Sequence, residues 1–359
     1  MNFSDAKIVQ KILFRFHYKI YLLILQFQIY SKMIKAGIVG GAGYTAGELM
    51  RVLLHHPQVE LSYIHSNSHA GQPICAVHHD LTGDTDMTFT GEVGKAEVVF
   101  LCLAHGKSIE FLNANRLPDA TKIIDLSQDF RINHIFQAHD GACRECVYGL
   151  PEYYGEQIKK AHNIANPGCF ATAFELALLP LAKAGLLTDE VHINGITGST
   201  GAGQAPTSTT HFSWRNNNIS IYQPFTHRHL LEVRKTLEIA AKGTVPELNF
   251  LPLRGNFTRG IFMSAYTATN LQLTELQDIY RQYYADAAFT IVCDREISLK
   301  EVVGTNKCLL RIEKYVNKAL ITSVIDNLLK GASGQAVQNM NLMFGIDEKT
   351  GLQLKGIGF

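Results

Sequence analysis

The sequence has almost no net charge, few cysteines and no long apolar run. Its 33 Lys and Arg residues nearly balance 32 Asp and Glu residues, for a formal net charge of +1, so nothing indicates a nucleic-acid or other polyanion partner. The seven cysteines are scattered, which is typical of a reducing compartment, and they lack the second close pair that a structural zinc site needs. We therefore expect a cytoplasmic protein that binds neither metal nor nucleic acid.

The first 32 residues combine basic residues with an apolar run that is too short to cross a bilayer. The run covers residues 21–25, and no small-residue cleavage pattern follows it. A second methionine, Met33, directly precedes a regular strand pattern. We predict that residues 1–32 are an upstream extension and that the protein has no stable membrane association. The alternative is a helix that lies on a membrane surface.

A glycine-rich turn joins this first strand pattern, over residues 34–39, to a helical pattern. A second strand pattern follows over residues 59–64, so the segment indicates a βαβ unit. Glycines let the backbone turn tightly and approach a pyrophosphate, whose charge is met by the N–H groups of the helix. We predict a dinucleotide site formed by Gly40, Gly41, Ala42, Gly43, Tyr44, Thr45 and Ala46.

The end of the second strand indicates which dinucleotide binds. NAD sites commonly have Asp or Glu there, whereas residues 65–69 read His-Ser-Asn-Ser-His. No acid is present to repel a 2′-phosphate, and the hydroxyls of Ser66 and Ser68 can donate hydrogen bonds to one. These residues favour NADP, although ordinary capping of the loop explains them as well.

Arg131 follows a further strand pattern, over residues 122–126, on the side where a ligand is expected to bind. A guanidinium there can bind a phosphate or a carboxylate through two hydrogen bonds. The alternative is an ion pair on the surface with Asp125 or Asp129.

Cys169 follows Asn-Pro-Gly at the start of a helical pattern. Free N–H groups and the positive end of the helix stabilise a thiolate, so we expect a lowered thiol pKa and a nucleophile at neutral pH. The alternative is a small apolar residue in a buried turn.

The pattern after Cys169 indicates a second, α+β domain. Strand patterns over 191–196, 260–266 and 309–313 are interleaved with a helix over 273–285, and a last helix covers 334–344. The predicted fold class is α/β, with a Rossmann-type domain at 33–168 and the α+β domain at 169–330. We expect the last helix, within 331–345, to pack back on the first domain.

Seven motifs in order resemble the N-acetyl-gamma-glutamyl-phosphate reductases, which are related to the aspartate-semialdehyde dehydrogenases. They lie at residues 39–49, 125–131, 148–152, 166–172, 198–203, 227–229 and 326–345. The resemblance implies an enzyme of arginine biosynthesis that reduces an N-acyl-γ-glutamyl phosphate with NADPH, releasing the semialdehyde and phosphate. It also implies a catalytic and dimerisation role for the second domain, and a homo-oligomer, dimer or tetramer.

The resemblance assigns the nucleophile to Cys169 and the acid–base group to the segment His227–His229. We favour His229 for proton transfer and His227 for substrate binding, but the sequence leaves their order open. Asn339 on the last helix is expected near the nicotinamide, although apolar neighbours on that helix are explained by core packing alone. The expected substrate-binding residues are Arg131, Ser199, Gly201 and Arg259.

Two segments depart from the family pattern. Gln204-Ala205 replaces a basic pair, and residues 223–226 replace a glycine pair, so the acyl group is open: acetyl is expected and succinyl is the alternative. The loss of a basic pair argues against an acidic acyl group unless Arg254 or Arg259 compensates. The competing functions are an aspartate-semialdehyde dehydrogenase, a cysteine hydrolase and a dinucleotide-binding regulator without catalysis.

Overall fold

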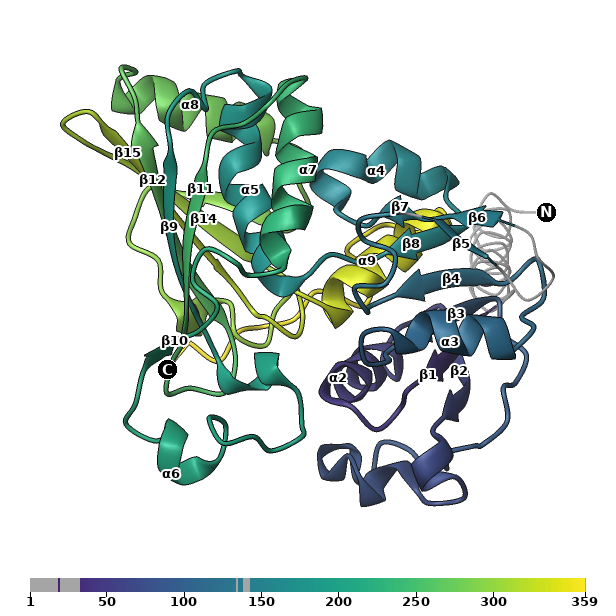
Figure 1. Ribbon diagram of the computed structural model, residues 1–359. Helices are drawn as coiled ribbons and strands as arrows, with labels where there is room; N and C mark the ends of the chain where they lie inside the picture. The colour runs from purple at the N-terminus through teal and green to yellow at the C-terminus, as the bar shows by residue number, and fades with distance from the viewer. Residues whose placement is uncertain (1–18, 20–32, 134, 138–142, 359) are drawn as a thin grey trace, which may run out of the picture.

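The computed structural model describes residues 19, 33–133, 135–137 and 143–358. The predicted upstream extension therefore lies outside the described residues except at position 19. Two sheets with their helices stand side by side (Figure 1). The chain passes from the first to the second between the strand Asn163–Ala165 and the helix Cys169–Lys183.

The first sheet is parallel throughout, with strand order β2-β1-β3-β4-β8-β7. Its strands are β1 (Ile34–Val39), β2 (Val59–His65), β3 (Val98–Leu101), β4 (Lys122–Asp125), β7 (Val147–Tyr148) and β8 (Asn163–Ala165). Its helices are α2 (Tyr44–Leu53), α3 (Lys107–Ala114) and α4 (Pro151–Lys160). Continuous apolar runs such as β3, buried along its whole length, suit a sheet that is covered on both faces.

The second sheet is mixed, with strand order β10-β11-β9-β12-β15-β14-β13. Its strands are β9 (Val191–Thr197), β10 (Ser220–Ile221), β11 (Leu248–Arg254), β12 (Ile261–Ala268), β13 (Thr290–Cys293), β14 (Cys308–Tyr315) and β15 (Lys318–Ile325). Along β12, buried and half-buried residues alternate strictly. This period of two places one face of the sheet in the core and leaves the other partly exposed.

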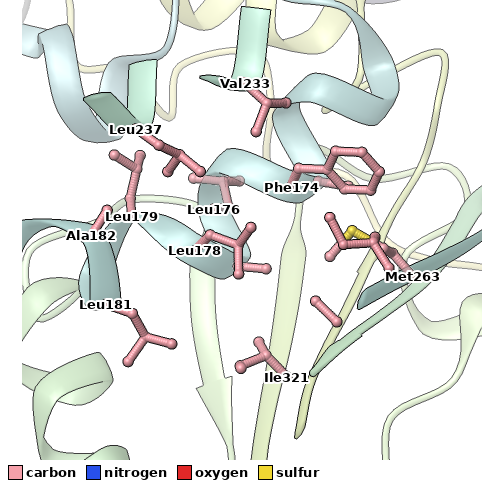
Figure 2. Packing of buried hydrophobic residues seen from close by; sticks show 14 of the residues in the cluster. Phe174, Leu176, Leu178, Leu179, Leu181, Ala182, Val233, Leu237, Met263 and Ile321 are labelled. Atoms are coloured by element: carbon pink, nitrogen blue, oxygen red, sulfur yellow. The ribbon is translucent and has the colours of Figure 1, made fainter. Parts of the chain in front are cut away.

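Three helices pack on the second sheet: α5 (Cys169–Lys183), α7 (His229–Ala241) and α8 (Leu273–Tyr283). Every residue of α5 from Phe170 to Ala182 is buried, as expected for a helix that is apolar on all sides. Figure 2 shows leucines of α5 between α7, which contributes Val233, and the sheet, which contributes Met263 and Ile321. Burying each such side chain stabilises the fold by about 1.5–3 kcal/mol, so the start of α5 is firmly fixed.

The last helix, α9 (Ser333–Met343), follows β15 of the second sheet but packs on the first sheet's helices. It packs against α2 and α4, and its apolar residues belong to the core of the first sheet. Ser333 Oγ donates to the carbonyl of Thr45 in α2 at 2.7 Å. The ammonium group of Lys330 lies 2.7 Å from Oε1 of Glu152 in α4, with both side chains buried. Helix α9 is therefore part of the domain built on the first sheet (Figure 1).

The remaining elements are short. They are β5 (Ile135–Gln137) and β6 (Cys143–Glu145), which form an antiparallel pair, α6 (Phe212–Arg215), and the 3-10 helices η1 (Asn67–His69), η2 (Ile74–Ala76), η3 (His79–Leu81), η4 (Ser199–Ala202) and η5 (Leu299–Glu301).

Candidate active site

The glycine-rich turn between β1 and α2 has the conformation that a dinucleotide site needs. Gly40 has a positive φ of 84°, and a Cβ there would lie 2.6 Å from the carbonyl oxygen of Cys102. Gly43 is the N-cap of α2, no side chain caps this helix, and a Cβ on Gly43 would meet nothing within 4 Å. The first N–H groups of α2 are therefore open to an anion, so the predicted residues 40–46 fit a pyrophosphate.

The loop after β2 holds the two serines that were expected near a 2′-phosphate. The Oγ atoms of Ser66 and Ser68 lie 3.3 and 2.8 Å from Nδ1 of His69. Both hydroxyls therefore have a partner within the loop, which agrees with loop capping. No acid stands between residues 65 and 69, so the loop also suits a cofactor with a 2′-phosphate.

Cys169 is the first residue of α5, as predicted, and Gly168 is the N-cap. Cys169 is half-buried. A Cβ on Gly331 would lie 2.7 Å from the Cβ of Cys169. A Cβ on Gly168 would lie 2.5 Å from Nε2 of His229 and 2.8 Å from Nη1 of Arg131. The structure thus brings three predicted site residues together at one turn.

The expected lowering of the Cys169 pKa is not observed. Burial raises the pKa of the thiol above its usual value, and the charge of Arg131, the N–H of Phe170 and the charge of Arg228 act in the opposite direction. The prediction was wrong because the sequence shows the helix terminus but not how much of the thiol is withdrawn from water. Formation of the thiolate therefore requires a nearby base.

The two histidines flank the start of α7 and are both buried. His229 begins the helix, and the ring centroids of His227 and His229 are 4.7 Å apart in an edge-to-face arrangement. Burial, followed by the charge of Arg228, lowers the pKa of His227 to about 4. Burial, followed by the charge of His227, lowers the pKa of His229 well below its usual range. The neutral form of His229 is therefore favoured, and its Nε2 lies at the turn before Cys169.

Glu232 connects these groups, and the sequence did not identify it. Its carboxylate accepts hydrogen bonds from the backbone N–H of Gly168 at 2.9 Å and from Arg131 Nη1 at 3.2 Å. It also lies 3.9 Å from Nε2 of His229. The only signal in the sequence is its position three residues after His229, which places both on one face of α7.

Arg131 is buried, with 5% of its surface exposed. It pairs with Glu232 and donates to the carbonyl of Leu126 at 2.9 Å. The alternative of a surface pair with Asp125 or Asp129 is therefore wrong. Arg131 lies beside the turn that precedes Cys169, and its substrate-binding role stays a prediction.

A second buried carboxyl lies behind this network. The hydroxyl of Tyr148 donates to Glu232 at 3.0 Å and lies 3.3 Å from Glu175, which is fully buried in α5. Burial is the largest cause that raises the pKa of Glu175 well above its usual value. Burial therefore favours the neutral form of Glu175, and the ion pair of Arg131 in this cluster is made with Glu232.

The predicted substrate loop, residues 198–203, is attached to the site through Asn327. Asn327 donates to Oγ1 of Thr200 at 3.0 Å and lies against Gly331, the residue that contacts Cys169. Ser199 and Gly201 belong to η4, where Ser199 is half-buried and Gly201 exposed. The structure thus links this loop to the turn at Cys169 through one residue, Asn327.

Arg259 has carboxylate partners from both sheets. Its guanidinium pairs with Glu48 on α2 and lies 3.0 Å from Asp326 at the end of β15. The structure therefore gives Arg259 a role in joining the two layers, and its substrate-binding role stays a prediction.

Asn339 is fully buried on α9. Its amide donates to the carbonyl of Gly149 at 2.9 Å and to Asn166 at 3.0 Å, while its own Oδ1 has no partner. The second contact places Asn339 beside Asn166, the residue three positions before Cys169. Its contact with the nicotinamide stays a prediction.

The described residues contain no group of three or more His, Cys, Asp or Glu placed to hold a metal ion. No helix in the described part of the chain is long and apolar enough to cross a membrane.

Comparisons with known proteins agree with this architecture. The semialdehyde dehydrogenase NAD binding domain matches residues 35–161, and the semialdehyde dehydrogenase dimerisation domain matches residues 169–327. A dimerisation domain implies a homo-oligomer. Among solved structures, aspartate semialdehyde dehydrogenase II of Vibrio cholerae complexed with ASA has a TM-score of 0.66 at 15% identity, covering 88% of this chain and 99% of that one. The enzyme of Candida albicans with NADP has a TM-score of 0.65 at 14% identity, covering 87% and 99%. The fold is shared, which confirms the predicted class.

Sequence relatives are much more similar. The N-acetyl-gamma-glutamyl-phosphate reductase of Christiangramia forsetii is 56% identical over 324 residues, which cover 90% of this chain and 99% of that protein. The enzyme of the same name from Flavobacterium johnsoniae is 53% identical over 328 residues, covering 91% and 100%. The resemblance seen in the seven motifs is thereby confirmed, and the chain belongs to the N-acetyl-gamma-glutamyl-phosphate reductase family of semialdehyde dehydrogenases.

Proposed function

We propose that this protein reduces N-acetyl-γ-glutamyl phosphate to N-acetyl-glutamate 5-semialdehyde and phosphate with NADPH, as a step of arginine biosynthesis. The observation that carries the proposal is the convergence at Gly168. The residue after it, Cys169, is the nucleophile, and His229 and Arg131 both adjoin the same turn. The names of the relatives and the nucleotide-binding domain support the same reaction.

In the first step Cys169 displaces phosphate from the substrate. His229, neutral because it is buried, accepts the thiol proton while Sγ bonds to the acyl carbon and the carbon–oxygen bond to phosphate breaks, leaving a thioester. The carboxylate of Glu232, 3.9 Å from Nε2, stabilises the imidazolium that results. Arg131 lies beside Cys169 and supplies positive charge where the phosphate departs.

In the second step the thioester is reduced and the aldehyde leaves. NADPH, when bound, supplies the hydride for the thioester carbonyl. As the resulting oxyanion collapses, the carbon–sulfur bond breaks, and the imidazolium of His229 returns its proton to the thiolate of Cys169. His227, whose ring lies against His229, excludes water from this transfer and orients the substrate.

The cofactor fits the turn between β1 and α2. The open N–H groups at Gly43 and after it would hold the pyrophosphate, and Ser66 and Ser68 would face the 2′-phosphate by giving up their contacts with His69. Asn339, with its unpartnered Oδ1, would contact the nicotinamide. The loop residues Ser199 and Gly201, together with Arg259, would bind the substrate.

We also propose an oligomeric state and a cellular location. The match to a dimerisation domain supports a dimer or a tetramer of this chain in the cytoplasm. We place the boundary between the nucleotide-binding and catalytic domains at residue 168, with the segment 331–345 returning to the first domain.

The reverse reaction provides the first test. Protein beginning at Met33 is assayed for phosphate-dependent NADP⁺ reduction with N-acetyl- and N-succinyl-glutamate semialdehyde side by side, with aspartate semialdehyde as a third substrate. We expect turnover with the N-acetyl substrate only when phosphate is present. The matched variant Cys169→Ser should bind NADPH normally and lose turnover.

Each other outcome has a definite meaning. A preference for the succinyl substrate would assign the alternative acyl group, and a preference for aspartate semialdehyde would assign the related dehydrogenase. Cofactor binding without turnover of any aldehyde would favour the non-catalytic regulator. Substantial activity of Cys169→Ser would remove the covalent mechanism.

A further inference from the structure

Arg254 lies at the same edge of the second sheet as the proposed substrate loop. It is the last residue of β11, which pairs in parallel with β9, and it stands opposite Thr197, the last residue of β9. The carboxyl ends of parallel strands meet at one edge of a sheet. The backbone of Arg254 therefore lies beside Thr197, directly before the segment that carries Ser199 and Gly201.

The backbone of Arg254 is held from two sides. The guanidinium of Arg215, which is buried, donates to the carbonyl of Arg254 at 2.7 Å. The next residue, Gly255, donates its N–H to the carbonyl of Thr197 at 2.9 Å. The side chain of Arg254 thus starts from a fixed point, which is a requirement for specific recognition.

The guanidinium of Arg254 lies over the ring of Tyr222, with Cζ 4.6 Å from the ring centroid. The ring of Tyr222 meets that of His227 edge-on, with centroids 5.6 Å apart. After burial and Arg228, the charge of Arg254 is the next cause that lowers the pKa of His227 to about 4. Arg254 therefore lies within electrostatic reach of the reacting groups.

Two other arginines of this region already have carboxylate partners. Arg131 pairs with Glu232, and Arg259 pairs with Glu48 and Asp326. In the described part of the chain no carboxylate lies within ion-pair distance of Arg254, and its buried Nε–H has no acceptor. A guanidinium that is stacked on a ring keeps its donors in its own plane, where they fit a carboxylate.

We propose that Arg254, held against Tyr222, binds a carboxylate of the acyl-glutamyl substrate and determines substrate specificity. This inference rests on the proposed function. The substrate offers its α-carboxylate and, when the acyl group is succinyl, a second carboxylate of the same chemistry. The phosphate lies on the other side, with Arg131 and Arg228, whose charges act directly on Cys169.

The test compares the full-length enzyme with Arg254→Gln and Arg254→Lys. Arg295→Gln, an exposed arginine of the same domain, is the matched control. Phosphate-dependent NADP⁺ reduction is measured with N-acetyl-glutamate semialdehyde, N-succinyl-glutamate semialdehyde and N-acetyl-4-aminobutanal, which lacks the α-carboxylate. We expect Arg254→Gln to raise the aldehyde KM roughly 10–100-fold, the usual value of a hydrogen bond to a charged group, with kcat and the phosphate KM nearly unchanged.

The three aldehydes identify which carboxylate is bound. If Arg254 binds the α-carboxylate, its replacement raises the KM of the two semialdehydes equally and leaves the KM of N-acetyl-4-aminobutanal unchanged. If it is the acyl carboxylate, the loss is confined to the succinyl substrate. Arg254→Lys keeps the positive charge but lacks the two parallel donors of the guanidinium, so it should recover part of the affinity. It also serves as the test if the Gln variant does not fold.

Unchanged KM values for all three aldehydes, or an equal loss for all three, would overturn the assignment of Arg254. A wild-type enzyme with no phosphate-dependent activity on any of them would instead remove the proposed function, and this inference with it. A loss that appears equally in Arg295→Gln would also count against a specific role.

Discussion

The backbone N–H of Gly168 donates to Oε2 of Glu232 at 2.9 Å, so a side chain of α7 holds the turn that precedes the first residue of α5. The same carboxylate pairs with Arg131 and accepts from Tyr148. One buried anion therefore fixes the backbone before Cys169, the neighbouring cation and the helix that carries His229.

Replacing Glu232 with Gln should destabilise the protein strongly. The substitution leaves Arg131 buried without its anion, and breaking a buried pair in this way typically costs about 3–5 kcal/mol. Urea unfolding at pH 7 measures the loss. Glu238→Gln on the exposed side of the same helix is the control and should cost less than about 1 kcal/mol. Equal stability of the two variants would contradict the proposed role of Glu232.

The ligand-free thiol of Cys169 should react slowly at neutral pH. Burial raises its pKa, so the thiolate becomes abundant only at alkaline pH and the rate of alkylation should keep rising beyond the ordinary thiol value of about 8.5. Iodoacetamide labelling followed by peptide mass analysis gives the rate for this residue at each pH. A rate that is already constant at pH 7 would show a lowered pKa instead.

The glycines of the cofactor turn should differ in what they contribute. Gly40→Ala places a Cβ 2.6 Å from a carbonyl oxygen at a positive φ and should lower the thermal unfolding midpoint. A Cβ at position 43 would lie within 4 Å of no other group, so Gly43→Ala should leave the unfolding midpoint unchanged. It should weaken NADPH binding, because the added methyl group covers the N-terminal end of α2. Fluorescence titration measures the binding, and Gly155→Ala, also without neighbours, is the control. Normal cofactor binding by Gly43→Ala would exclude this turn as the pyrophosphate site.

The pair between Glu48 and Arg259 should make stability depend on pH. Burial alone would raise the pKa of Glu48, but hydrogen bonds and charge from Arg259, with a contribution from Arg51, lower it below its ordinary value. A carboxyl with a depressed pKa in the folded state stabilises the protein above its unfolded pKa, about 4.3, and loses this contribution as pH falls through the folded value.

Glu48→Gln should therefore be less stable than the wild type by about 1–3 kcal/mol at pH 7. The difference should shrink as the pH falls from 4.5 toward 3 in urea unfolding experiments, with the exposed Glu110→Gln as control. A difference that is independent of pH would mean that packing, and not charge, accounts for the effect.

Local patterns in the sequence predicted much of the fold. The strand, glycine turn, helix and second strand over residues 34–64 are observed as β1, α2 and β2, because each follows its own period. The start of α5 at Cys169 was predicted from its Pro-Gly approach. By contrast, β11 was not predicted, because Pro252 interrupts its pattern and proline rarely stands inside a sheet.

The contacts that assemble the site could not be predicted in the same way. Arg131 and Glu232 are separated by 101 positions, and no periodicity connects residues so far apart. The raised pKa of Cys169 depends on burial by segments such as Gly331, which only the folded chain shows. Motifs predicted the candidate reacting groups, while tertiary structure determines how far each is buried and so the direction of its pKa shift.

The position of α9 has a consequence for how the chain is made. The first layer takes its last helix from the end of the sequence, where Ala336, Val337 and Met340 join the core that β1 and α2 begin. Domains generally fold as units during synthesis, from the N-terminus onward. Here α2 and α4 pack against α9, so the nucleotide-binding domain is completed only after Met343 has been synthesised. We expect a nascent chain that stops before Ser333 to expose an apolar surface to other proteins.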